Sequence, residues 1–226
     1  MNELDKPQVH DLLQIDPALP ISGCVAELTW VEKTLVGCPW VVVLRAQPSF
    51  GRIAIGVRGA VRSERWGAFC DGSQVRTMVR PEQLLPSSCR TPALRTLHEM
   101  RERWADLALS WGPTGSVGFE LASGRRVTTE ASDLDLVIRA PQRIPVDRAR
   151  FLLDRTLGLG TRVDVRVETP LCGFALEEYA LASSSRILLR YAEGVRLGIS
   201  PFPPPPSLVG AGRARVRGPA SRHTAE

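Results

Sequence analysis

The chain has 226 residues, 43% of them hydrophobic and 23% charged, which is the composition of a folded globular protein with one large or two small domains. No apolar run reaches the roughly 18 residues that cross a bilayer, and the polar N-terminus is no secretory signal, so we expect a cytoplasmic protein without a membrane partner. The net charge of +5 comes almost wholly from arginine, because only two of the 29 basic residues are lysines.

An arginine-rich chain suits phosphorylated ligands, because the guanidinium group binds phosphate through two parallel hydrogen bonds. The base composition of the source genome would produce the same excess, and this alternative stays open. Aromatic residues do not interleave with a basic stripe, so no nucleic-acid partner is expected. The five cysteines are widely spread and form no C-x-x-C pair, which indicates reduced, structural thiols.

The N-terminal part of the chain predicts two strands joined as a hairpin. Residues 40–45 are β-branched and apolar, and residues 52–57 alternate in polarity. Before them, His10 stands beside an acid, where we expect a capping or docking role. After them, the segment 58–66 carries arginines spaced four and three apart, which share one face if the segment is a helix. This face is either an anion site or a solvated basic surface, and its members are Arg58, Arg62 and Arg65.

A turn-rich stretch at residues 86–90 predicts a boundary between two domains. A short strand over 75–79 and a short helix over 81–85 precede it, and the strongest helix begins at Thr91 and runs to about Ser110. We therefore expect an N-terminal α/β domain, a second domain, and a disordered tail rich in proline and arginine. These parts comprise residues 1–88, 89–202 and 203–226.

Paired carboxylates on a strand are the most informative feature of the second domain. A glycine-rich turn with Gly115 and Ser116 opens a short helix, and the strand 132–138 follows with Asp133 and Asp135. Alternate residues of a strand point to one face, so the two carboxylates would project together with α-carbons roughly 7 Å apart. A strand end with two solvated acids is the alternative.

The rest of the second domain is expected to continue as mixed helix and strand, which completes an α+β fold. The strand over 161–167 has Asp164 among its polar positions, and a hairpin follows near the end of the domain. The other predicted elements are helices over 146–157 and 174–182 and the hairpin over 186–197.

The three aspartates suit divalent-cation chemistry. Asp133, Asp135 and Asp164 would offer oxygen ligands to Mg²⁺ (or Mn²⁺), which takes its remaining ligands from water and substrate phosphates. Two such ions can stabilise the entering and leaving oxygens of an in-line displacement at phosphorus. Gly115 and Ser116 would add backbone N–H groups for a departing pyrophosphate.

A glycine-serine turn followed by two aspartates one residue apart and a later strand aspartate resembles the nucleotidyltransferase superfamily, which includes DNA polymerase β and antibiotic adenylyltransferases. The resemblance implies a second domain with a polymerase β-type mixed sheet and flanking helices. A narrower resemblance, in order over residues 8 to about 202, is to the phosphoribosyl-dephospho-CoA transferases of malonate decarboxylase. It is carried by residues 10–13, 57–66, 115–121 and 132–136.

The narrower resemblance implies transfer of 2′-(5-triphosphoribosyl)-3′-dephospho-CoA to a serine of the apo acyl carrier subunit of malonate decarboxylase, with release of pyrophosphate. Asp133 and Asp135 match the family's catalytic pair, and Asp164 is assigned from the wider superfamily. The three N-terminal arginines fall in a family motif, where we infer a contact to the triphosphate or the dephospho-CoA. The rival interpretations are an ATP-dependent adenylyltransferase acting on a small molecule or protein, and a catalytically idle docking module.

Overall fold

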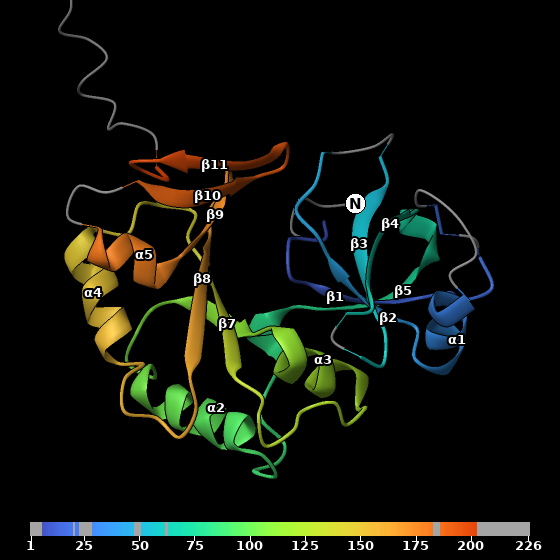
Figure 1. The fold of residues 1–226 in the computed structure, drawn as a ribbon, viewed down its shortest axis with the longest axis horizontal. Coiled ribbons are helices and arrows are strands. Elements are labelled where there is room, and N and C mark those ends of the chain that lie inside the picture. Colours follow the sequence, from blue (N-terminus) through green and yellow to red (C-terminus); the bar gives the residue numbers. More distant parts are fainter. Residues whose placement is uncertain are drawn as a thin grey trace, which may run out of the picture.

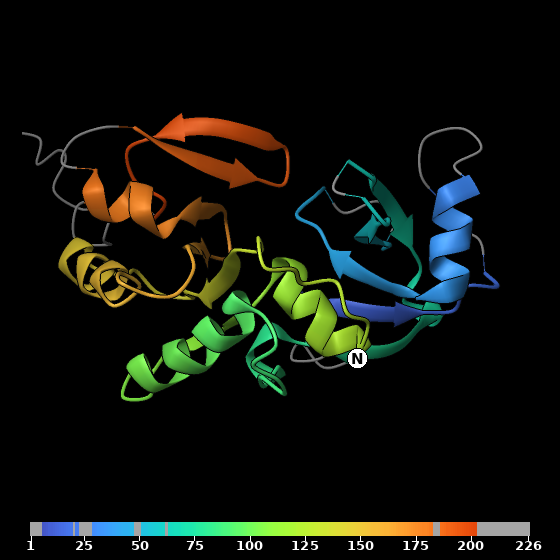
Figure 2. The same ribbon diagram turned by 60° about the horizontal axis from the view of Figure 1, so that its bottom comes forward.

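The computed structural model describes residues 6–19, 21–22, 29–47, 51–61, 63–182 and 186–202. Over these residues the chain forms two β-sheets with five α-helices, which confirms the expected α+β class. The sheets stand side by side, and helix α3 (Gly115–Ser123) lies between them in both views (Figure 1, Figure 2). The expected tail, residues 203–226, and Arg62 lie outside the described residues.

The first sheet is a five-stranded antiparallel sheet in the order β4-β3-β2-β1-β5. Alternate side chains of its strands point to one face, where they pack against Val31 and Leu35 of helix α1 (Thr29–Gly37). The other face looks toward α3. The strands are β1 (Leu12–Ile15), β2 (Trp40–Val43), β3 (Ile53–Arg58), β4 (Arg65–Cys70) and β5 (Val75–Val79).

The second sheet has the order β11-β10-β9-β8-β7-β6, and only β7 and β8 pair in parallel. Helix α4 (Val146–Asp154) makes the crossover that a parallel pair needs. Its apolar side chains share one core with α2 (Pro92–Arg103) and α5 (Leu176–Leu181). The strands are β6 (Ser110–Pro113), β7 (Leu134–Arg139), β8 (Val163–Glu168), β9 (Gly173–Ala175), β10 (Ile187–Tyr191) and β11 (Gly194–Gly198).

Arg58 and Arg65 belong to paired strands of a β-hairpin, so the helix considered for residues 58–66 is wrong. Arg58 ends β3, Arg65 begins β4, and the two residues are register partners. The Glu64 carboxylate accepts the backbone N–H of Ala60 at 2.7 Å, and the Glu64 carbonyl accepts that of Gly59 at 2.9 Å. These local bonds close the turn, which a count of arginine spacings does not reveal.

Two further differences from the expected elements concern the end of the long helix and an additional first strand. The long helix begins after Thr91 as expected but ends at Arg103, not near Ser110, because the chain turns back at Trp104. Leu107 is nevertheless buried in the same core, so the apolar residues of the predicted helix pack there even beyond the helix end. Strand β1 was not expected, since four residues carry little periodicity. The boundary between two domains at residues 88 and 89 stays a prediction.

Buried ion pairs join the two sheets. Arg139 at the end of β7 contacts Asp11 at 2.7 Å and Glu82 at 2.9 Å. Arg45, which follows β2, pairs with Glu168 at the end of β8. Because these side chains are largely shielded from water, the pairs are screened little by salt. They fix the first sheet against the second, with the β3–β4 hairpin facing α3.

Candidate active site

The three predicted aspartates meet at one end of the parallel strand pair. Asp135 on β7 and Asp164 on β8 are register partners, and Asp133 immediately precedes β7. One carboxylate oxygen from each of the three lies within 4.8 Å of the others. All three side chains are partly exposed, so the carboxylates are close together and still accessible to a ligand. Such a set of oxygen donors fits Mg²⁺ or Mn²⁺.

Local hydrogen bonds hold Asp133 in this position. The carbonyl of Ser132 accepts the Thr161 hydroxyl at 3.2 Å, and the N–H of Leu134 donates to the carbonyl of Arg162 at 2.9 Å. Both neighbours of Asp133 are thereby tied to the segment that leads into β8. The spacing of the aspartates in space therefore depends on the pairing of β7 with β8.

The electrostatics of the cluster favour a cation. Burial raises the pKa of Asp135, and the negative charges of Asp133 and Asp164 raise it further, against the opposing charges of Arg166 and His10. Asp164 also forms an ion pair with Arg162 at 2.8 Å. A positive ion bound among these carboxylates would offset the repulsion between their negative charges.

Gly115 brings the first turn of α3 against the cluster. Its φ is +58°, and a Cβ added there would overlap the Asp135 carboxylate, so only glycine fits on both counts. The N–H of Thr114 donates to the carbonyl of Asp135 at 2.8 Å. The helix therefore starts beside the three acids, with the half-buried Ser116 in its first turn. The first N–H groups of a helix lack intrahelical acceptors and suit anionic groups.

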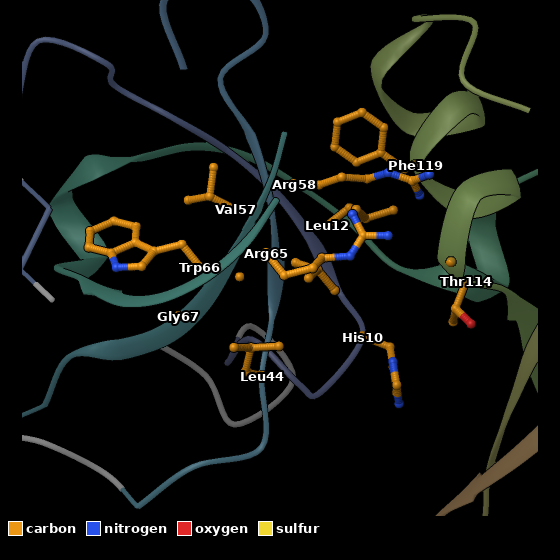
Figure 3. Close-up of a pocket in the computed structure, with 13 residues that line it drawn as sticks. His10, Leu12, Leu44, Val57, Arg58, Arg65, Trp66, Gly67, Thr114 and Phe119 are labelled. Carbon is orange, nitrogen blue, oxygen red and sulfur yellow. The ribbon is translucent and has the colours of Figure 1, made fainter. Parts of the chain in front are cut away.

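The two described arginines of the N-terminal motif face the same region. Arg58 and Arg65 extend from β3 and β4 toward α3, and they line a cavity of about 290 Å³ with Thr114 and Gly115 (Figure 3). Arg62 is outside the described residues, so its predicted place beside them stays a prediction. The structure thus brings together the acids, the glycine turn and two of the three arginines.

A polar groove opens on the other side of the acids. Its volume is about 660 Å³, and Asp135 and Asp164 lie on its wall together with Arg162, Arg166 and Arg190. The acidic cluster therefore lies between a small, largely apolar cavity and a larger polar groove.

Comparison with known proteins identifies the family of the chain. The model of the phosphoribosyl-dephospho-CoA transferase MdcG N-terminal domain matches residues 8–81, and that of the C-terminal domain matches residues 79–201. The chain belongs to the phosphoribosyl-dephospho-CoA transferase family. A transferase of this name from Pseudomonas fluorescens strain Pf-5 is 40% identical, over 86% of this chain and 93% of its own length.

Two further phosphoribosyl-dephospho-CoA transferases show the same breadth of similarity. The one from Pseudomonas aeruginosa is 39% identical over 87% of this chain and 94% of its own length. The one from Azotobacter vinelandii is 37% identical over 87% of this chain and 94% of its own length. No solved structure matches the chain.

In this transferase family member, His10 connects the N-terminal segment to the second sheet. Its Nε2 lies 3.0 Å from Oε1 of Glu168, which also pairs with Arg45, and its ring lines the cavity beside Thr114. Burial alone would raise the pKa of Glu168, but the His10 hydrogen bond and the charges of His10 and Arg45 lower it overall. Among the described non-glycine residues only His10 has a positive φ, at +73°. That strain is not visible in the sequence.

Cys38, Cys70 and Cys172 are free and buried, as expected for reduced, structural thiols, and Cys89 is free and exposed. Cys24 lies outside the described residues. Over the part of the chain that the structure describes, every helix is too short or too polar to span a bilayer.

Proposed function

We propose that this protein transfers 2′-(5-triphosphoribosyl)-3′-dephospho-CoA to a serine of the apo acyl carrier subunit of malonate decarboxylase. The carrier serine oxygen forms a bond to the α-phosphorus, and the bond from that phosphorus to the β-phosphate oxygen breaks. Pyrophosphate leaves, the serine proton passes to solvent, and the carrier retains a phosphodiester-linked prosthetic group. The family membership and the convergence of three aspartates beside a helix N-terminus support this reaction.

Asp133, Asp135 and Asp164 would hold the divalent cation in this proposal. When bound, Mg²⁺ or Mn²⁺ neutralises charge on phosphate oxygens and lowers the barrier to displacement at phosphorus. The first turn of α3, with Gly115 and Ser116, directs N–H groups at the leaving phosphates. Arg58 and Arg65, which extend toward α3 from β3 and β4, would bind phosphate groups of the substrate.

The carrier would approach from the polar groove, because this is the larger of the two openings beside the acids, about 660 Å³ against about 290 Å³. The proposal places the reaction in the cytoplasm, where the free cysteines stay reduced. The single observation that carries the proposal is the meeting of the three carboxylates with Gly115 against Asp135.

Intact-mass measurement of the apo carrier tests the reaction. The carrier is incubated with the protein, Mg²⁺, and either the triphosphoribosyl precursor or ATP. We expect a mass increase equal to the phosphoribosyl-dephospho-CoA group with the precursor and no change with ATP. An added adenylyl group would instead establish the adenylyltransferase, and an unmodified carrier in both reactions would contradict any transfer to it.

A further inference from the structure

Two glycines leave the floor of the small cavity without side chains. Gly56 on β3 and Gly67 on β4 are register partners, and both line the cavity. Their neighbours Val57 and Trp66 turn the other way, into the core under α1. Figure 3 shows these two side chains on the far side of the strands from Arg58, Arg65 and Phe119.

Paired glycines in the middle of adjacent strands are costly, because each loses more chain entropy than a residue with a side chain and packs nothing. A glycine within a strand often marks a place where a ligand approaches the backbone closely. The floor is open at Gly67, where an added Cβ would meet only Leu44 Cδ1 at 3.8 Å, whereas Val42 and Leu44 already crowd Gly56, at 3.1 and 3.2 Å from an added Cβ. The cavity, called the slot below, is also lined by Leu12 and Phe119, and its open floor and apolar lining suit a flat, largely apolar group.

We infer that this slot binds the purine ring of the dephospho-CoA portion of the substrate; the inference rests on the proposed function. Gly115 belongs to both the cavity wall and the acidic cluster, so the group in the slot lies near the reacting phosphate. In the substrate the adenosine is joined through one ribose to that phosphate, whereas the pantetheine thiol is at the far end of a diphosphate and an extended chain. At about 290 Å³ the cavity is at the small end of ligand pockets, ~300–1,000 Å³, and holds a base rather than the whole substrate.

A basic groove continues from the slot. Arg58 and Phe119 line both, and beyond them the groove of about 500 Å³ is lined by Lys33, Arg125 and Arg126. Four cationic side chains next to the base site provide a place for the 5′-diphosphate, which bonds directly to the adenosine. The order of subsites along the protein then follows the order of groups in the substrate: reacting phosphate, base, diphosphate.

Gly67 offers a way to fill the slot without disturbing the sheet. A Cβ added there meets only Leu44 Cδ1, at 3.8 Å, and the backbone needs no positive φ. The series Gly67→Ala, Gly67→Val and Gly67→Leu therefore adds volume in steps to the cavity. The matched control is Gly72→Leu, at an exposed glycine outside the cavity with no heavy atom within 4 Å of the added Cβ.

Isothermal titration with dephospho-CoA measures the result. We expect the dissociation constant to rise stepwise through the series, by at least tenfold for Gly67→Leu, and to stay within about twofold for Gly72→Leu. ADP should compete with dephospho-CoA for the unmodified protein, and 4′-phosphopantetheine should not. Thermal unfolding checks that each variant is folded.

Equal affinity of Gly67→Leu and Gly72→Leu for dephospho-CoA, or competition by phosphopantetheine instead of ADP, would overturn the assignment of the slot. The carrier-mass experiment separates this failure from failure of the proposed function. Carrier modification together with unchanged binding in the series rejects the slot alone. Stepwise loss of binding without carrier modification rejects the transfer reaction and retains the base site.

Discussion

Gly115 and Asp135 are in direct contact: the α-carbon of the glycine lies so close to the carboxylate that a methyl group would overlap Oδ2. The contact fixes the first turn of α3 against the acidic cluster. It also explains why a residue with φ of +58° opens this helix. The position of the α3 N-terminus relative to the three carboxylates is therefore set by one glycine.

Gly115→Ala should lower the transfer rate by about a hundredfold or more, because the new methyl group must displace the Asp135 carboxylate or the helix start by a fraction of an ångström or more. The control is Gly124→Ala. Gly124 also has a positive φ, +71°, but an added Cβ there meets nothing within 4 Å. Both variants should lose about 1 kcal/mol of stability from backbone strain. Equal transfer rates in the two variants would show that the Gly115 contact has no part in catalysis.

Mn²⁺ binding tests the acidic cluster without any substrate. Asp164→Asn should weaken Mn²⁺ binding, measured by electron paramagnetic resonance, by at least tenfold because one of three carboxylate ligands is lost. Asp147→Asn, whose side chain is 94% exposed at the start of α4, provides a variant with the same change of charge. Weakening of equal size in both would mean that general charge, not ligation, sets the affinity.

The Arg45–Glu168 pair should contribute strongly to stability. Arg45→Met leaves a carboxylate that is only 8% exposed with His10 as its remaining ionic partner, so the free energy of unfolding should fall by roughly 3 kcal/mol in urea titrations at neutral pH. Arg76→Met removes a comparable pair with Asp16 at the surface, where Arg76 is 60% exposed, and should lower the free energy of unfolding far less. If both changes cost the same, the pair between the sheets is not effectively buried.

Glu120 of α3 should make stability depend on acid pH. Burial would raise its pKa, but the N–H groups of Thr128 and Val127 and the Arg90 side chain lower it from 4.5 to about 2. A lowered pKa stabilises the folded state above the unfolded pKa, and the contribution disappears as pH falls from about 4.5 to about 2.

Over that interval the unmodified protein should lose roughly 3 kcal/mol more than Glu120→Gln, measured by denaturant unfolding at several pH values. The bonds also hold the chain that leads from α3 toward Asp133, with the Thr128 N–H at 2.7 Å from Glu120 Oε2. Parallel pH profiles for the two proteins would show that this carboxylate does not lower its pKa on folding.

Local patterns in the sequence located the three aspartates but did not show that their side chains lie close together in the fold. Alternation predicted the strands that became β7 and β8, and glycine-serine predicted the start of α3. The parallel register of Asp135 with Asp164 depends on the crossover helix and on pairing between residues about thirty apart, which no local pattern encodes.

The N-terminal part was harder to predict for the same reason. The spacing of Arg58 and Arg65 fits a helix as well as a hairpin, and the Glu64 hydrogen bonds decide between them. The pairing of Gly56 with Gly67 depends on that hairpin, so the position of two glycines in the floor of the cavity could not be predicted from the sequence. The contact of His10 with Glu168 joins the two sheets across 158 positions of sequence.

The most direct test of the account is the rate at which Asp135→Asn modifies the apo carrier, followed by intact mass under single-turnover conditions. Loss of a carboxylate from the cation site should slow the transfer by on the order of a thousandfold or more, equal to several kcal/mol of transition-state stabilisation. Because Asp133 and Asp164 repel this carboxylate, the variant should unfold at the same or a higher temperature than the unmodified protein. Transfer at the unmodified rate by a folded Asp135→Asn protein would contradict the central role given to the three aspartates.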